Sequence, residues 1–167
     1  MHMSQLSVIS INEKNAALAV GLVANFRMEL KGLKGISSAP NHEAGKEEIL
    51  EYVQADWPCF AAVTDGEWIG YIVCRVEEPA VWVESIYVLP QYRRLGAASA
   101  LFAKAEEIAA AFGENTVYNN VHPNNEKMIS FLKKRGYTVL NLIEIRKPWP
   151  GENCGQKINV GKNEFEY

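Results

Sequence analysis

Two arginines and a glycine follow an apolar run near the middle of the chain, within residues 83–98. The run is typical of a strand, Arg93 and Arg94 of a tight basic turn, and the residues after Gly96 of a helix. The first amides of a helix have no acceptor within it, and the helix dipole adds positive charge there. Gly96 lets a ligand approach the backbone, and Ala98 keeps the first turn free of bulk. The segment therefore predicts a site for an anion such as a phosphate, to which guanidinium groups add charged donors.

A carboxylate, Glu84, interrupts the same apolar run. Because side chains alternate along a strand, we expect Glu84, Ile86 and Val88 on one face, and Ser85 and Tyr87 on the other. Burying an unpaired carboxylate is costly, so Glu84 needs a partner, a solvated position or a chemical role. One such role is that of a general base, which accepts a proton from a reacting group.

A second segment with chemical potential covers residues 125–137. Asn125 opens a predicted helix, Leu132 lies on its apolar face, and a Lys-Arg-Gly-Tyr sequence closes it at Gly136. An asparagine at this position is typical of a helix N-cap, and a contact with a ligand is the alternative.

The remaining pattern predicts the elements that must position these residues. We predict strands over residues 6–11, 59–64, 67–76, 80–88, 116–121 and 137–145, and a short last strand at 165–167. We predict helices from Asn12 or Asn15 to residue 30, and over residues 46–55, 97–112 and 124–135. An antiparallel meander followed by strand–helix–strand units indicates the α/β class, with a mixed sheet and helices on both faces.

The spacing Arg93-x-x-Gly96-x-Ala98, five residues after Val88, resembles the acyl-CoA-binding signature of the GNAT superfamily of N-acyltransferases. Segment 125–137 is similar to the second signature of that family, in which an Asn opens a helix that closes with Lys-x-Gly-aromatic. The resemblance extends to the order of the predicted elements.

This resemblance implies a GNAT-like fold, in which about four helices flank a central mixed sheet of six to seven strands. It implies a single N-acetyltransferase domain over residues 1–167, with a matched core at about 5–146 and a C-terminal extension at 147–167. The aromatic side chains of that extension are predicted to pack on the sheet edge or on the second subunit of a homodimer.

The resemblance also implies an activity: transfer of an acetyl group from acetyl-CoA to a primary amine of a small molecule or peptide, by direct attack and without a metal. It implies that the Val88 backbone N–H polarises the thioester carbonyl and that Glu84 is the candidate general base. The residues implied in binding CoA are Ile86, Tyr87, Val88, Arg93, Arg94, Leu95, Gly96, Ala97, Ala98 and Asn125.

One position departs from the family pattern. Leu132 stands where many members carry a tyrosine that protonates the departing thiolate. The acid is therefore absent, a water or another residue, with Tyr87, Tyr118 and Tyr137 as candidates. The departure keeps open a second reading, an acyl-CoA-binding sensor or interaction module with weak catalysis.

A nucleotide-phosphate-binding domain without acyl chemistry is a third reading, although the chain contains no Gly-x-x-x-x-Gly-Lys-Ser/Thr sequence.

Composition limits the choice of partners and compartment. A formal net charge of −3 argues against broad binding of nucleic acid, which depends on neutralising phosphates. No apolar run approaches the length of a membrane span, and no signal peptide is evident, so we expect no membrane partner. Three unpatterned cysteines fit a reducing cytoplasm. A covalent route through Cys74 is the alternative to direct transfer.

Overall fold

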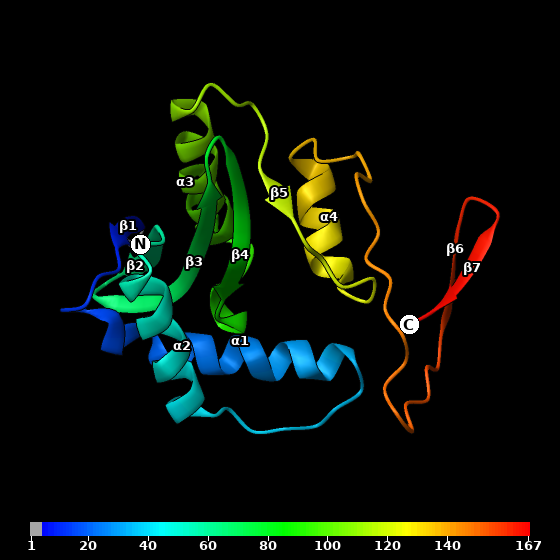
Figure 1. Ribbon diagram of the computed structural model, residues 1–167. Coiled ribbons are helices and arrows are strands. Elements are labelled where there is room, and N and C mark those ends of the chain that lie inside the picture. Colours follow the sequence, from blue (N-terminus) through cyan, green and yellow to red (C-terminus); the bar gives the residue numbers. More distant parts are fainter. Residues whose placement is uncertain (1–4) are drawn as a thin grey trace. The chain divides into compact units, whose positions relative to one another are not determined.

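The computed structural model describes residues 5–167 (Figure 1). The chain divides into two compact units, the first up to Asn120 and the second from Val121 to Tyr167. The first four residues of the predicted domain 1–167 lie outside the described range. The helices of the first unit are η1 (Ala16–Ala19), α1 (Val20–Leu33), α2 (His42–Gln54), η2 (Pro90–Tyr92) and α3 (Ala97–Ala111), where η marks a 3-10 helix. Its strands are β1 (Ser7–Ser10), β2 (Cys59–Thr64), β3 (Glu67–Glu77), β4 (Ala80–Val88) and β5 (Tyr118–Asn119). The second unit contains α4 (Glu126–Lys134), β6 (Lys157–Val160) and β7 (Asn163–Glu166).

The sheet of the first unit has the order β1-β2-β3-β4-β5. The first four strands pair antiparallel, and β5 pairs parallel to β4. Asp65 and Gly66 both have positive φ, at 49° and 78°, which suits the two-residue hairpin turn predicted between β2 and β3. The predicted strands 59–64 and 80–88 are confirmed at the same bounds.

The two faces of this sheet are covered by different helices. Phe26 of α1 contacts Tyr71 of β3 and Tyr87 of β4, with both ring centroids 6.1 Å away. Residues of η1, α1 and α2 share one buried cluster with Tyr71, Val73 and Tyr87. Helix α3 packs on β2, β3 and β4 through its own buried side chains, which include Leu101 and Phe102. Because alternate residues of a strand point to opposite faces, α3 covers the face that α1 and α2 leave open.

Helix α2 begins four residues earlier than the sequence predicted. Asn41 is its N-cap, and the Asn41 side chain accepts a hydrogen bond of 3.0 Å from the Ala44 amide. Residues 31–45 lie between the two predicted helices, and their glycines, proline and serines are typical of a loop. The cap and the continuation of α1 to Leu33 shorten that loop to residues 34–41.

A polar cluster joins α1 to α2 above the sheet. Arg27 donates from Nε to both carboxylate oxygens of Glu48, at 2.8 and 2.9 Å, and Tyr52 donates to the same carboxylate at 2.8 Å. Beneath it, the hydroxyls of Tyr71 and Ser85 are buried and have no hydrogen-bond partner among the residues that the structure describes. Burial raises the pKa of Tyr71 well above its ordinary value, so this phenol stays neutral.

We expect Tyr71→Phe to raise the free energy of unfolding by about 1 kcal/mol, because a buried hydroxyl without a partner is lost. The matched change Tyr52→Phe should lower it by about 1–3 kcal/mol, because the Glu48 carboxylate and the Arg27 guanidinium lose a bonded phenol. Urea unfolding of the three proteins measures both effects. A loss of stability in Tyr71→Phe would mean that the Tyr71 hydroxyl is satisfied by a buried water.

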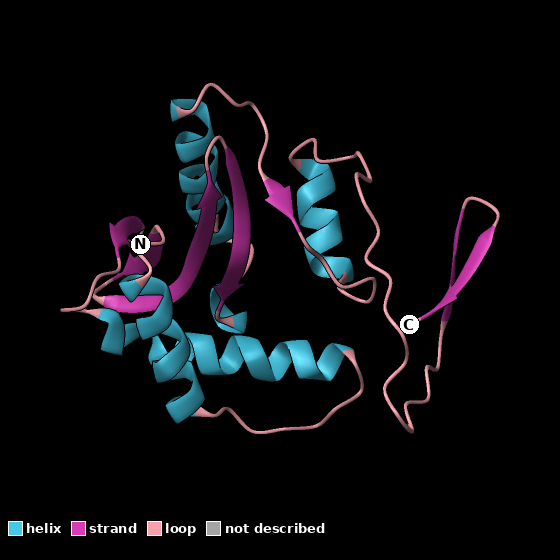
Figure 2. Ribbon diagram, in the orientation of Figure 1, coloured by secondary structure: helices cyan, strands magenta, loops and turns pink. Residues whose placement is uncertain are grey.

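The second unit differs most from the sequence expectation. Residues 137–156 form neither helix nor strand (Figure 2), although 137–145 was predicted as a strand. Its apolar side chains are exposed, with Val139 at 86% and Leu142 at 78%. The final residues form a hairpin, in which Lys157 pairs with Glu166 and Val160 with Asn163, where we predicted only a short strand at 165–167.

The fold class is nevertheless confirmed: a mixed sheet with helices on both faces, in the α/β (α+β) class. Within residues 5–167 there are four α-helices, as predicted. The central sheet has five strands and not the predicted six to seven, because residues 137–145 do not pair with it and β6 and β7 form a separate small sheet. Within that range no helix has the length and apolar character needed to cross a membrane.

Candidate functional site

A β-bulge in β4 places Glu84. Val73 of β3 pairs with Ser85 and the next residue, Cys74, pairs with Val83, so Glu84 has no partner on β3. One extra residue on one strand is the definition of a bulge, and bulges redirect the side chains around them. The bulge therefore breaks the simple alternation on which the expected face of Glu84 depended.

Arg75 shows which face the Glu84 carboxylate lies on. Arg75 pairs with Trp82 across the strands, its guanidinium lies 5.1 Å from the Trp82 ring, and its Nε lies 3.4 Å from a Glu84 oxygen. Arg75 alternates along β3 with Val73 and Tyr71, so it shares the face that α1 covers. The Glu84 carboxylate therefore lies on the face of Tyr71, whereas the sequence predicted the face of Ile86 and Val88.

Glu84 forms an ion pair with Arg75. The guanidinium of Arg75 binds Glu84 and Glu77, and the side chains of Arg75 and Glu84 are 26% and 33% exposed. A pair this exposed contributes little to stability. Glu84 is thus both ion-paired and reachable from solvent, and its role as a base remains a prediction.

The backbone of Val88 lies at an edge of the sheet where pairing with β5 has ended. Strand β5 pairs with β4 only at Trp82 and Val83 within the described residues. The Leu89 amide donates to Ile69 of β3 at 2.8 Å, and backbone groups alternate in direction along an antiparallel strand. The Val88 amide therefore points away from β3, which is the orientation that carbonyl polarisation requires.

The turn after β4 leads into α3 through two left-handed residues. Arg94 has a φ of 65° and Gly96 a φ of 89°, a value that favours glycine. The first amide that bonds within α3 is that of Ala100, which donates to the Gly96 carbonyl at 2.9 Å. The amides of Ala97, Ala98 and Ser99 consequently have no acceptor inside the helix. Fifteen residues of α3 add their dipole at this point, so the predicted anion site has the backbone that it needs.

The guanidinium of Arg93 contacts three groups of the first unit. Its Nε donates to the Val88 carbonyl at 2.8 Å, its Nη2 donates to both oxygens of Glu29 on α1 at 2.8 and 2.9 Å, and it lies 5.4 Å from the Tyr87 ring. The neighbouring Tyr92 donates to Glu67 of β3 at 2.6 Å. Arg94 and Leu95 are exposed, and Ala97 is buried.

Asn125 and Leu132 belong to the second unit. The Asn125 side chain accepts a hydrogen bond of 3.2 Å from the Met128 amide, so its role as the N-cap of α4 is confirmed. Its contact with CoA stays a prediction. Leu132 is buried, and an aliphatic side chain there has no proton to donate.

The structure adds two residues to the site that the sequence did not indicate, Arg75 and Glu29. A charged residue in the apolar run of β3 is a signal that could have indicated Arg75. Glu29 offered no such signal, because its partner Arg93 lies 64 residues away in the chain.

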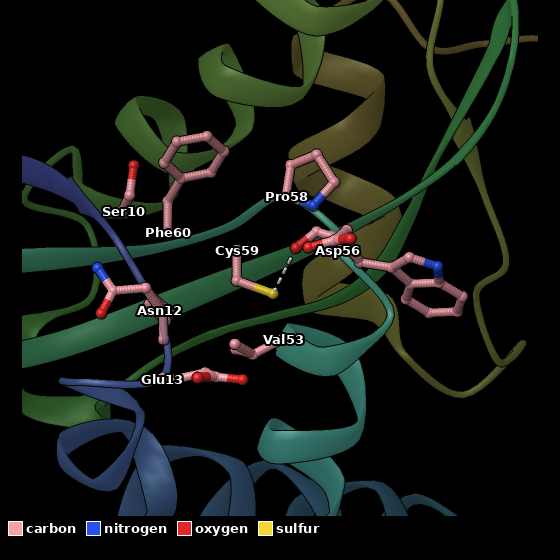
Figure 3. A pocket seen from close by; sticks show the side chains of 10 residues that line it. Ser10, Asn12, Glu13, Val53, Asp56, Pro58, Cys59 and Phe60 are labelled. Carbon is pink, nitrogen blue, oxygen red and sulfur yellow. Dashed lines mark hydrogen bonds between the residues drawn. The ribbon is translucent and has the colours of Figure 1, made fainter.

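A separate cavity of about 410 Å³ lies at another part of the first unit. Figure 3 shows Asn12, Glu13 and Asp56 around it, with Val53 and Cys59 among its apolar lining. None of the predicted site residues lines this cavity. No group of three or more His, Cys, Asp or Glu side chains with the arrangement of a metal site occurs within residues 5–167.

Two of the cysteines are buried in the first unit. Desolvation raises the pKa of both Cys59 and Cys74 to about 12, and both thiols are shielded from solvent. The thiolate is the reactive form, so neither residue has the properties of a nucleophile near neutral pH.

We expect one label per chain when the folded protein reacts with N-ethylmaleimide at pH 7, at the partly exposed Cys154, and three labels after unfolding in guanidinium. Intact mass and peptide mapping measure this. Labelling of Cys74 in the folded protein would contradict its burial and revive a covalent route.

Comparison with known proteins identifies the family. Residues 31–137 match the model of the acetyltransferase (GNAT) family. An N-alpha-acetyltransferase of Sulfurisphaera tokodaii is 32% identical over 114 residues, which cover 58% of this chain and 64% of that protein. An uncharacterized N-acetyltransferase of Mycobacterium tuberculosis is 33% identical over 76 residues, which cover 45% of this chain and 49% of that protein. The matched stretches thus span less than two thirds of the length of these relatives.

Solved structures show the same fold at lower identity. A ribosomal-protein-alanine N-acetyltransferase from Brucella melitensis biovar Abortus has a TM-score of 0.69 and 17% identity, and the match covers 86% of this chain and 99% of that one. An aminoglycoside N-acetyltransferase in complex with CoA has a TM-score of 0.66 and 24% identity, with 86% and 95% covered. The family model matches more than half of the sequence, so the chain belongs to the acetyltransferase (GNAT) family.

Proposed function

We propose that the protein is an acetyl-CoA-dependent N-acetyltransferase that acts on a primary amine of a small molecule or peptide. The observation that carries the proposal is the edge of β4, where the Val88 amide points away from β3 beyond the last pair with β5. The anion-binding turn and the free amides of α3 follow directly in the chain. One segment therefore supplies a donor for a carbonyl oxygen and a site for the diphosphate of acetyl-CoA.

The reaction that fits these groups is direct attack on the thioester. The neutral amine adds to the carbonyl carbon, the developing oxyanion accepts a hydrogen bond from the Val88 amide, and the carbon–sulfur bond breaks as the amide forms. Glu84 accepts the proton that the amine loses, directly or through a water. The thiolate of CoA then takes a proton from water or from one of the candidate tyrosines, Tyr87, Tyr118 or Tyr137, because the Leu132 position carries no acid. A backbone donor of this kind lowers the barrier by about 2.7–4 kcal/mol.

Two observations favour a second candidate, an acyl-CoA-binding sensor with weak catalysis. Arg75 pairs with the only carboxylate that the family pattern proposes as the base, and Leu132 replaces the usual acid. An ion-paired base and a missing acid both slow the acyl-transfer step, and neither affects the turn that would bind CoA.

Thermal shift and thiol release separate the candidates. Acetyl-CoA at ~100 times its dissociation constant adds ~2.7 kcal/mol, which for this size raises Tm by on the order of 5–11 °C. No shift with acetyl-CoA together with a shift for ATP would contradict the proposal in favour of a nucleotide-binding domain. A shift with acetyl-CoA but no release of CoA thiol across a panel of amines would identify the sensor.

The amine panel follows from the neighbours. The structurally similar proteins include an aminoglycoside N-acetyltransferase and a ribosomal-protein-alanine N-acetyltransferase, so the panel should contain an aminoglycoside, a peptide with a free N-terminus and simple alkyl amines. We propose a cytoplasmic homodimer with no nucleic-acid or membrane partner as the working form. The exposed Trp149 ring in the C-terminal extension supports an intermolecular contact. A monomeric mass at micromolar concentration would contradict the dimer.

A further inference from the structure

The turn between β4 and α3 is anchored by two side chains, each bound to a carboxylate. Tyr92 donates to Glu67 at the start of β3, on the surface of the protein. Arg93 donates to Glu29 on α1 and to the carbonyl of Val88. The anchors thus lie in one turn but reach different elements.

The Arg93 anchor makes more contacts than the Tyr92 anchor. The side chains of Arg93 and Glu29 are 25% and 43% exposed, so this pair, like that of Arg75 and Glu84, adds little to stability, and its effect is on geometry. The Arg93 guanidinium is fixed in three directions, by the Val88 carbonyl, by the two oxygens of Glu29 and by the face of the Tyr87 ring. An arginine side chain loses about 2 kcal/mol of rotamer freedom when it is ordered, so its position needs a partner that pre-orders it. Glu29 is that partner: its two oxygens accept from Nη2 while the Val88 carbonyl accepts from Nε, and these two attachment points together orient the plane of the guanidinium.

We propose that Glu29 is a positioning residue for the donor site. Through Arg93 it holds the turn against the end of β4, and so sets both the Val88 backbone and the amides at the start of α3. The inference rests on the proposed function, because it assigns those amides to the diphosphate of acetyl-CoA. Glu29 itself does not touch the substrate in this assignment.

Electrostatics and positioning predict opposite signs for the loss of Glu29. A carboxylate close to an anion site repels the anion, so loss of this Coulomb repulsion alone predicts tighter CoA binding in Glu29→Gln. A positioning role predicts weaker binding, because the guanidinium and the turn lose their fixed geometry. The sign of the change in Kd therefore decides between them.

Glu67→Gln is the matched control, because it removes the same charge from the other anchor of the same turn. We expect Glu29→Gln to raise the Kd of CoA, measured by calorimetry, by about tenfold. Glu67→Gln should leave it unchanged or lower it. In turnover assays Glu29→Gln should raise the KM for acetyl-CoA and lower kcat, because the turn that Glu29 holds sets the Val88 amide as well as the amides of α3. Tm should confirm that both variants fold.

A second measurement does not depend on CoA. The Arg93 Nε–H is bonded to the Val88 carbonyl, so its NMR signal, assigned by its loss in Arg93→Lys, should exchange slowly with water. Glu29→Gln should accelerate that exchange and Glu67→Gln should not. Unchanged exchange, or CoA binding as tight as in the wild type, would overturn the positioning role. A wild type that binds no CoA would contradict the proposed function instead, while the exchange rates would still test the role of Glu29.

Discussion

Replacement of Glu84 by Gln is expected to lower kcat/KM by about 10²-fold or more at neutral pH, because a positioned base contributes roughly 10²–10⁴-fold. The carboxylate is held at the bulge of β4, on the strand that also presents the Val88 amide. Gln keeps the size and hydrogen-bonding capacity of Glu but accepts no proton. The measurement is initial rates with the best acceptor of the amine panel.

The pH dependence of this loss distinguishes a base from a binding group. A base is needed because the amine is protonated, so the deficit of Glu84→Gln should shrink as pH rises toward an alkyl-amine pKa of ~10.4. A lost binding contact would give a deficit that is constant with pH and appears in the KM of the acceptor.

Glu77→Gln provides the control for charge. Glu77 contacts the same guanidinium of Arg75 as Glu84 does, from a more exposed position. It should retain kcat/KM near that of the wild type at every pH. Equal losses in the two variants would show that the cluster acts through net charge, and wild-type turnover in Glu84→Gln at all pH values would exclude the base assignment.

The elements that position the site could be predicted from local pattern. Strands β2 and β4 and helix α3 combine a clear period with a turn or glycine at each end, and local chemistry decides such elements. The anion site followed for the same reason, since a basic turn before a helix N-terminus is visible within a few residues of sequence. Arg94 and Gly96 are left-handed in that turn, and anion binding there remains a prediction.

The side-chain partners could not be predicted in the same way. The bulge at Glu84 depends on the register between two strands, which period alone does not determine, and one extra residue reverses the face of a side chain. The Arg93–Glu29 pair joins positions 64 residues apart. Such pairs depend on tertiary packing of α1 against the sheet.

The predicted strand 137–145 failed for a related reason. Its β-branched and aliphatic residues have the composition of a strand, but a strand exists only where a neighbour supplies ladder hydrogen bonds. Within the described residues no strand pairs with this segment, and its apolar side chains remain exposed. Composition therefore identified a segment able to form a strand and could not identify its partner.

Gly70→Ala is expected to lower kcat/KM by about 10²-fold through the position of Val88, without touching either substrate. Gly70 pairs with Val88 across β3 and β4. A Cβ at position 70 would lie 2.7 Å from the Tyr87 carbonyl oxygen and 3.0 Å from Val88 Cγ2, which is closer than packed atoms allow. The end of β4 must therefore move, and the Val88 amide and the following turn must move with it.

Gly45→Ala separates this effect from loss of stability. A Cβ at Gly45 would lie 2.9 Å from the Val20 carbonyl oxygen and 3.1 Å from the Ala24 amide nitrogen, where α2 packs on α1. Both variants should lose about 1–3 kcal/mol in free energy of unfolding, as overpacked sites do. Only Gly70→Ala should also lose kcat/KM and CoA affinity in the folded protein at low temperature. If the two variants lose activity equally, the crowding at Gly70 acts through general destabilisation, and the geometry of Val88 does not limit the rate.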